Sequence, residues 1–303
     1  MIFLGVIVLV LATGPLLQLF AAPRMHAAIA ETYPPPGQIL EVDGAKMHIY
    51  CEGQGSQTVI IVNSTNDQSL AWRDVQAKLA GNARVCIYDR LGRGWSAAAS
   101  RERSAENIAD EFNGLVKAAG IAPGFVLVGD QEGTIYASMF AWRHPGQAGA
   151  LLLVNEINVP PEMYASTVIP ISLVSLAMAP LQTFSWVLGG KDFIKSLKGD
   201  CLPWMDNNVC GFWRAWKADG YDTQTAFFEG YSIPAGLRSL FEPQVKYGNL
   251  PIVILSVAPG DCSTQLFGRS TNCRMQVFPG IKNYPLIDKS PQTIVDAVKV
   301  LLH

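Results

Sequence analysis

Short apolar runs recur along the chain, and patterns of helical spacing separate them. The runs predict eight strands, at 39–42, 46–51, 58–62, 84–88, 125–128, 150–154, 251–255 and 274–278. Between them, the sequence predicts a helix over 68–79, one that Ser104 caps, one that ends at Arg143 and a final one that begins at Ser290. Apolar strands that alternate with helices indicate a mostly parallel sheet covered on both faces, that is, an α/β protein.

This alternation is interrupted over residues 159–247. Residues 163–190 contain no charged residue, but Pro170 and Pro180 disfavour a straight membrane span. Apolar helices that form a lid explain the composition better, and such a lid would rest on a membrane surface or on another subunit. We therefore predict a core in two parts, 38–158 and 248–303, with the lid inserted between them.

The N-terminal part of the chain has a different character. Residues 2–22 are apolar and uncharged, and a helix of this length is about as long as a bilayer core is thick. We expect a transmembrane anchor over 1–23, followed by a Pro-rich spacer over 24–37. The alternative is a cleaved signal peptide, with a small-residue cleavage site at 28–30.

Composition excludes some classes of function. Charged residues make up 16% of the chain, the net charge is −2 and no basic run occurs, which argues against nucleic-acid binding. With four histidines and no C-x-x-C motif, neither a metal site nor a cofactor is expected.

The six cysteines bear on the compartment. Two pairs lie close in sequence, Cys201 with Cys210 and Cys262 with Cys273, and disulfides between them would favour an exported globular domain. The alternative is free buried thiols, above all for Cys51 and Cys86 in predicted strands. Arg24, which follows the apolar run, argues weakly for a cytoplasmic globular domain. The side of the membrane on which the globular domain lies is therefore left open, with the exported side favoured.

One motif stands out among these elements. The apolar strand 125–128 leads into Gly129-Asp130-Gln131-Glu132-Gly133, and a helical segment follows. A strand, G-x-x-x-G and a helix form the frame of a nucleophile elbow, in which the central residue is exposed at the top of the sheet. The central residue here is Gln131, whose amide is neither a nucleophile nor a base.

Two further motifs accompany the elbow in a fixed order. Residues 35–37 lead to the segment 48–53, and Asp89-Arg90 is followed by glycines and a serine at 92, 94 and 96. With the elbow, this pattern resembles the α/β-hydrolase superfamily, specifically its membrane-anchored, epoxide-hydrolase-like or iminopeptidase-like branch. The resemblance covers about 34–158 and 248–303, and the family carries its cap where residues 159–247 lie.

The resemblance implies a serine at the elbow, a histidine after the last strand and an acid that orients it. The serine position is Gln131 and the histidine position is Asn283. Asp261 follows the strand 251–255 and corresponds to a remnant of the orienting acid, but with no imidazole to orient, a hydrogen bond in a loop or helix cap is the favoured role. Loss of both nucleophile and base predicts a catalytically inactive site.

The resemblance also implies an oxyanion hole. One backbone donor belongs to the residue after the nucleophile, here Glu132, whose carboxylate would oppose developing negative charge. The other donor region contains Asn63 and Ser64. A structural account is that Glu132 complements the positive end of a helix and that Gln131 fills the vacated space and bonds to Asn283.

Three functions are compatible with these residues. We favour an inactive, membrane-anchored pseudoenzyme, an accessory or structural subunit of a membrane protein complex, with lipid contacting residues 2–22 and protein partners contacting 163–190. The first alternative is a hydrolase of lipid-like esters or amides with a non-standard site, dependent on Gln131, Asp261 or Ser64. The second is a non-catalytic binder of an apolar small molecule between lid and sheet.

Overall fold

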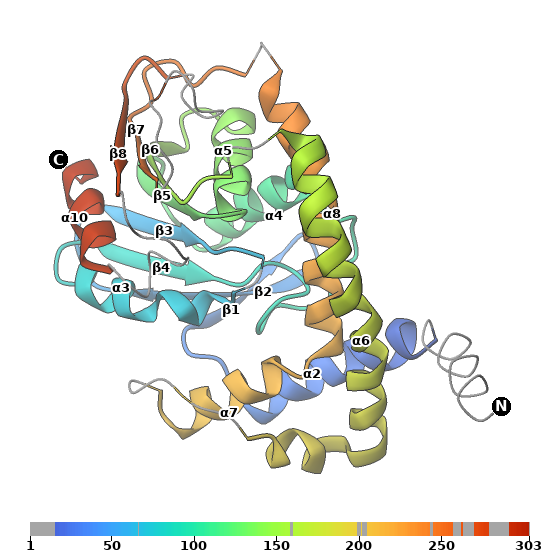
Figure 1. Ribbon diagram of the computed structural model, residues 1–303. Coiled ribbons are helices and arrows are strands. Elements are labelled where there is room, and N and C mark those ends of the chain that lie inside the picture. Colours follow the sequence, from blue (N-terminus) through green and yellow to red (C-terminus); the bar gives the residue numbers. More distant parts are fainter. Residues whose placement is uncertain are drawn as a thin grey trace.

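The strands predicted from the apolar runs all form. The computed structural model describes residues 16–65, 67–157, 160–198, 201, 205–242, 245–256, 262, 270–278 and 291–302. Its strands are β1 Gln38–Val42, β2 Ala45–Glu52, β3 Thr58–Val62, β4 Arg84–Tyr88, β5 Phe125–Asp130, β6 Ala148–Val154, β7 Ile252–Ser256 and β8 Cys273–Val277. They form one sheet in the order β1-β2-β4-β3-β5-β6-β7-β8 (Figure 1).

The sheet is mostly parallel, as predicted. β1 and β2 pair antiparallel, β2 pairs antiparallel with β4, and every later pairing is parallel. The strand order reverses between β3 and β5, whose neighbours continue in opposite directions. The loops that leave the carboxyl ends of these two strands therefore diverge, and open α/β sheets place their sites at such a point.

Helices cover both faces of the sheet. They are η2 Ser69–Trp72, α3 Arg73–Leu79, α4 Ala105–Ala118, α5 Gly133–Arg143 and α10 Pro291–Leu301. α4 and α5 pack on one face, and α3 and α10 pack on the other, so each face has its own apolar core (Figure 1). The predicted cap is present: the hydroxyl of Ser104 accepts a hydrogen bond from the N–H of Asn107.

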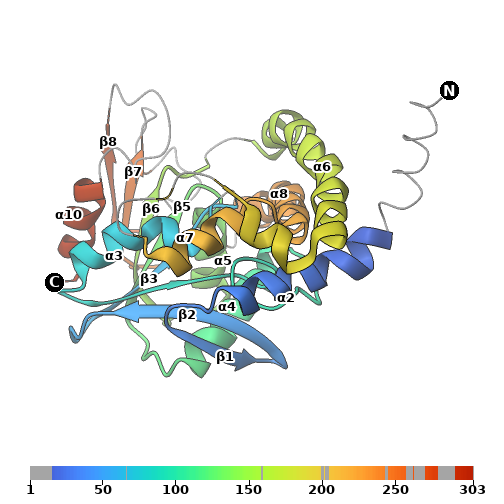
Figure 2. The ribbon, with the colours of Figure 1, turned by 90° about the horizontal axis from the view of Figure 1, so that it is seen from below.

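The lid is helical and is inserted between β6 and β7. It consists of α6 Pro161–Ser196, α7 Asn207–Trp216 and α8 Gly220–Phe241. Gly190 has a positive φ of 54°, which breaks α6 near its end. Figure 2 shows α6 and α8 at the end of the molecule away from α10.

The N-terminal region differs from the expected spacer. Residues 24–32 belong to a helix, α2 Ala22–Thr32, which continues the short π-helix η1 Leu17–Ala21. α2 packs against all three lid helices, with Met25 and Ile29 fully buried. This tertiary burial, which local sequence does not show, stabilises a short helix that would be marginal alone. The Pro-rich stretch after residue 32 is not helical, as expected.

Among the residues that the structure describes, no helix combines the length and the apolar character that a membrane span needs. The single-pass anchor predicted for residues 1–23 is not supported by this finding, and its first 15 residues lie outside the described ranges.

All six cysteines are paired. The predicted bonds Cys201–Cys210 and Cys262–Cys273 are confirmed. The alternative of free thiols at Cys51 and Cys86 is wrong, because these residues form a third disulfide. They are paired in register on the adjacent strands β2 and β4, a proximity that the sequence separation of 35 residues conceals.

Candidate functional site

The turn between β5 and α5 has the sharp geometry of an elbow. Gln131 at its tip has a φ of 49°, in the left-handed region that costs a non-glycine residue roughly 1–2 kcal/mol. Its N–H donates to the carbonyl of Val154 at 3.0 Å, and its carbonyl accepts from the N–H of Thr134 at 3.0 Å. Neighbouring backbone thus holds the strained residue in place, and strain of this kind is concentrated at functional sites.

The two glycines of the motif are required by close packing. A Cβ on Gly129 would lie 2.7 Å from the carbonyl oxygen of Gly133, and a Cβ on Gly133 would lie 2.2 Å from that of Val62. Helix α5 therefore begins in direct backbone contact with the end of β3. This contact brings the loop after β3 against the elbow.

The carboxylate of Glu132 is directed into that loop. It is buried, and its Oε2 accepts a hydrogen bond of 3.4 Å from the N–H of Thr65. Its Oε1 accepts one of 3.2 Å from the hydroxyl of Tyr164 in α6. Burial and the charge of Glu132 both raise the pKa of Tyr164, so the hydroxyl stays protonated and donates. The backbone N–H of Thr65, in the loop after β3, is therefore occupied by a side chain of the protein itself.

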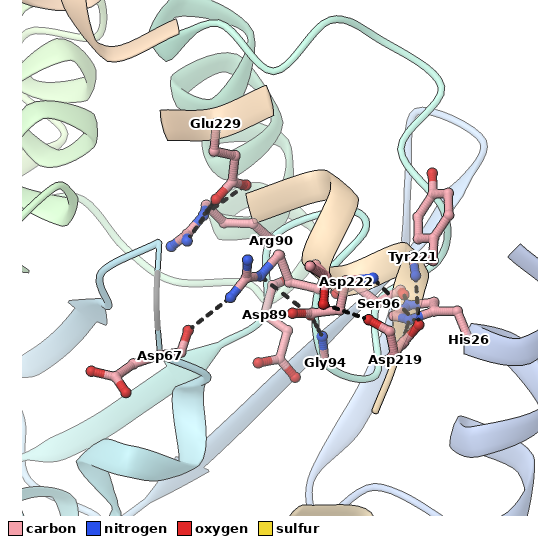
Figure 3. A network of polar contacts seen from close by, with 12 residues as sticks. His26, Asp67, Asp89, Arg90, Gly94, Ser96, Asp219, Tyr221, Asp222 and Glu229 are labelled. Carbon is pink, nitrogen blue, oxygen red and sulfur yellow. Dashed lines mark hydrogen bonds and ion pairs between the residues drawn. The ribbon is translucent and has the colours of Figure 1, made fainter. Parts of the chain in front are cut away.

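Arg90 holds the same loop from the other side. Its Nη1 donates to the carbonyl of Asn63 at 2.8 Å and its Nη2 to the carbonyl of Ser64 at 3.0 Å. Its Nε donates to Glu229 of α8 at 3.1 Å (Figure 3). The conformation of residues 63 and 64 is thus coupled to the lid through one guanidinium group.

Glu229 is at the centre of a buried ionic network. It pairs with Arg90 at 2.9 Å and with Arg103 at 3.4 Å, and Arg103 pairs with Glu111 at 2.8 Å. Burial opposes the charged form of Glu229, but the positive charge of Arg90 outweighs it and lowers the pKa of this carboxyl. Sequence reasoning missed this network. The available signal was a carboxylate inside an apolar lid helix, which requires a buried partner.

A second polar group lies beside the elbow, at the end of β6. Asn155 has a φ of 51° and is buried, and among the described residues neither polar atom of its side chain has a hydrogen-bond partner. Burial raises the pKa of the neighbouring Glu156 to about 7, although hydrogen bonds from its own backbone and from Ser256 act in the opposite direction. The sequence did not indicate either residue as part of a site.

The other predicted site residues are only partly placed. Asn63 and Ser64 lie in the buried loop after β3, and Gln131 and Glu132 form the elbow. Asp261 and Asn283 lie outside the described residues, so the predicted contact between Gln131 and Asn283 is untested. Within the described ranges, no three His, Cys, Asp or Glu side chains are grouped in a way that could hold a metal ion.

Comparison with solved structures identifies this arrangement. Cfl2 of Burkholderia cenocepacia superposes with a TM-score of 0.64 at 18% identity, over 88% of this chain and 95% of that one. The chain has the α/β-hydrolase fold. The epoxide hydrolase CorEH matches with a TM-score of 0.63 at 12% identity, over 87% and 97% of the two chains. ALR0039 of Nostoc, which is provisionally described as an α/β hydrolase, matches with a TM-score of 0.61 at 16% identity, over 88% of this chain and 97% of that one.

Sequence relatives cover less of the chain. No family model matches the chain. The uncharacterized protein YbdG of Bacillus subtilis is 23% identical over 121 residues, which are 39% of this chain and 37% of YbdG. An uncharacterized protein of Schizosaccharomyces pombe is 30% identical over 86 residues, 28% of this chain and 16% of that protein. The chain thus matches well under half of the length of these relatives.

Proposed function

We propose that this chain uses the α/β-hydrolase fold for binding and does not carry out serine-type hydrolysis. The observation that carries the proposal is the Glu132 carboxylate on the N–H of Thr65. In an acyl-transfer site this N–H would stabilise an oxyanion, and a carboxylate there repels the charge that develops in the transition state. The amide of Gln131 at the elbow tip supplies no nucleophile in compensation.

The resemblance of the solved relatives favours a second candidate, a hydrolase with a non-standard site. CorEH is titled an epoxide hydrolase. In the present chain, Glu132 is a buried carboxylate that accepts a hydrogen bond from a lid tyrosine, and a carboxylate can act as a nucleophile. Glu156, with a pKa of about 7, is suited to proton transfer near neutral pH. The solved relatives, which include proteins described as hydrolases, give no support to an accessory subunit of a membrane complex.

The two candidates differ in turnover. We would incubate the full-length protein with nitrophenyl esters of short and long acids and with aryl epoxides, and compare wild type with Glu132→Gln. Glu41→Gln is the matched control, because Glu41 is an exposed glutamate on β1, distant in the sheet order from the elbow. The binding proposal expects no turnover above the buffer rate for any of the three proteins. Turnover by wild type and Glu41→Gln that is lost in Glu132→Gln would overturn it and establish the hydrolase candidate.

A further inference from the structure

Exposed apolar side chains are concentrated on two elements that lie next to each other. Leu16, at the N-terminal end of η1, and Leu19 and Phe20 within it are 57–66% exposed. On α6, Leu181, Phe184 and Leu188 are exposed by 53%, 45% and 74%. We call these six residues the apolar surface.

Helical geometry places each group on one face. Leu181, Phe184 and Leu188 are spaced i, i+3 and i+7, so they lie along one side of α6. The opposite side is packed against the protein, since Ala179 and Thr183 are fully buried. The outward face of α6 therefore presents three large apolar side chains that no element among the described residues covers, which is unusual for an exposed helix.

A buried hydrogen bond joins the two halves of the apolar surface. The Nε2 of Gln18 in η1 donates to the Oγ1 of Thr183 in α6 at 3.2 Å. Both side chains are buried, so the bond is shielded from competing water. The exposed residues of η1 thus lie beside those of α6 in a fixed arrangement.

The helix that follows η1 is fixed as firmly. In α2, the Nδ1 of His26 bonds to the carboxylate of Asp219 in the lid at 2.5 Å, and its Nε2 donates to the carbonyl of Ser96 in the core at 2.8 Å (Figure 3). Both nitrogens face oxygen acceptors, so the ring is a protonated imidazolium. The N-terminal segment therefore cannot hinge freely about residue 26, because it is tied to lid and core at once.

Charge distribution indicates what covers the apolar surface. Residues 2–22 contain no charge, and η1 lies at the C-terminal end of this uncharged stretch. The first charges beyond the surface include Arg24 after η1 and Lys191 at the end of α6, and Lys191 pairs with Glu31 of α2. Asp192 and Lys195 follow in α6. These bordering charges comprise three cations, Arg24, Lys191 and Lys195, and two carboxylates, Glu31 and Asp192. An apolar face with a slight excess of cations at its border suits the boundary between acyl chains and anionic headgroups.

We propose that the apolar surface of η1 and α6 lies in the interface of an anionic lipid bilayer, with Arg24 and Lys191 at the level of the headgroups. A continuous uncharged sequence that leads into the surface favours a bilayer over a second copy of the chain. The arrangement would hold the carboxyl edge of the sheet and its lid in a fixed orientation to the membrane. This inference does not depend on whether the elbow is catalytic.

The test uses the full-length protein on vesicles of phosphatidylcholine and phosphatidylglycerol. The native cysteines are all in disulfides, so a single added cysteine can carry a nitroxide label. We would compare Leu188→Cys with Val300→Cys, a matched control because Val300 is an apolar residue 61% exposed on α10, at the other end of the molecule (Figure 2). On vesicles, the Leu188→Cys label should become several-fold more accessible to oxygen than to a water-soluble nickel complex, while the control label stays aqueous.

Three results would overturn the proposal. In the first, the protein floats with the vesicles but both labels stay equally aqueous. In the second, the protein does not float with the vesicles. In the third, the Leu188→Cys labels couple to each other in lipid-free solution and the protein is a dimer there, which would assign the apolar surface to a second copy of the chain.

Discussion

His26 and Asp219 are 193 residues apart in sequence and share a buried hydrogen bond of 2.5 Å. Burial would lower the pKa of His26, but the charge of Asp219 and the hydrogen bonds to Asp219 and Ser96 outweigh it, and the pKa rises from 6.5 to about 9. Asp222 of the lid adds to the negative field and itself pairs with Arg93. Helix α2 is thus attached to the lid and to the core by the buried positive charge of His26.

This relationship predicts how stability depends on pH. A raised pKa in the folded state contributes stability that is fully present below pH 6.5 and lost as the pH rises through about 9, here about 3 kcal/mol in all. The difference in urea midpoint between wild type and His26→Gln should therefore be largest below pH 6.5 and shrink as the pH rises through about 9. Asp219→Asn should abolish the same pH dependence, and a difference that persists unchanged in strong alkali would refute this account.

The buried network around Glu229 should be sensitive to removal of one partner. Glu229→Gln leaves the guanidinium groups of Arg90 and Arg103 without their shared carboxylate, and we expect a loss of about 3–5 kcal/mol in the free energy of unfolding, measured in urea. Glu162→Gln is the control, because Glu162 faces Arg238 at 3.6 Å with both side chains mostly exposed. That change should barely shift the midpoint, and equal shifts for both variants would count against a special role for the network.

Close backbone packing at the elbow makes a third prediction. Gly133→Ala would put a methyl group within 2.2 Å of the Val62 carbonyl, and we expect a loss of about 3 kcal/mol or more or a failure to fold. Gly81→Ala is the matched change, since no heavy atom lies within 4 Å of a Cβ there. Thermal unfolding should separate the two variants clearly, and a normal melting temperature for Gly133→Ala would show that the loop after β3 does not contact α5 in this way.

The inactive-site proposal predicts that restoring a nucleophile is not enough. Neither Gln131→Ser nor Gln131→Ser with Asn283→His should react with a fluorophosphonate probe for serine hydrolases, because Glu132 still occupies the N–H of Thr65. Adding Glu132→Ala frees this donor and should give slow labelling of Ser at position 131, read by intact mass. Rapid labelling of Gln131→Ser alone would contradict the assigned role of Glu132.

The sequence predicted the sheet and the elbow well. β3, β5, β6 and β7 are continuous apolar runs, and the spacing of Gly129 and Gly133 defines the turn between strand and helix. Both signals are local, so a single sequence contains them. The strain at Gln131 follows from the same local turn.

The remaining features depend on long-range contacts, which no local pattern encodes. The segment 24–32 is short and only weakly apolar, and it is helical because the lid buries Met25 and Ile29. Glu229 and Arg90 are 139 residues apart, and each is an ordinary charged residue until the fold brings them together. The direction of the Glu132 side chain likewise depends on Tyr164 of the lid.

The docking of α2 also has a consequence for the order of events during synthesis. The helix leaves the ribosome long before Asp219 of α8, so Met25, Ile29 and the imidazole of His26 have no final partners while most of the sheet is being made. Pairing over such a separation is slow, and exposed apolar segments of nascent chains invite aggregation. Helix α2 is thus translated before the sheet, and its contacts with the lid can be complete only after α8 has been made.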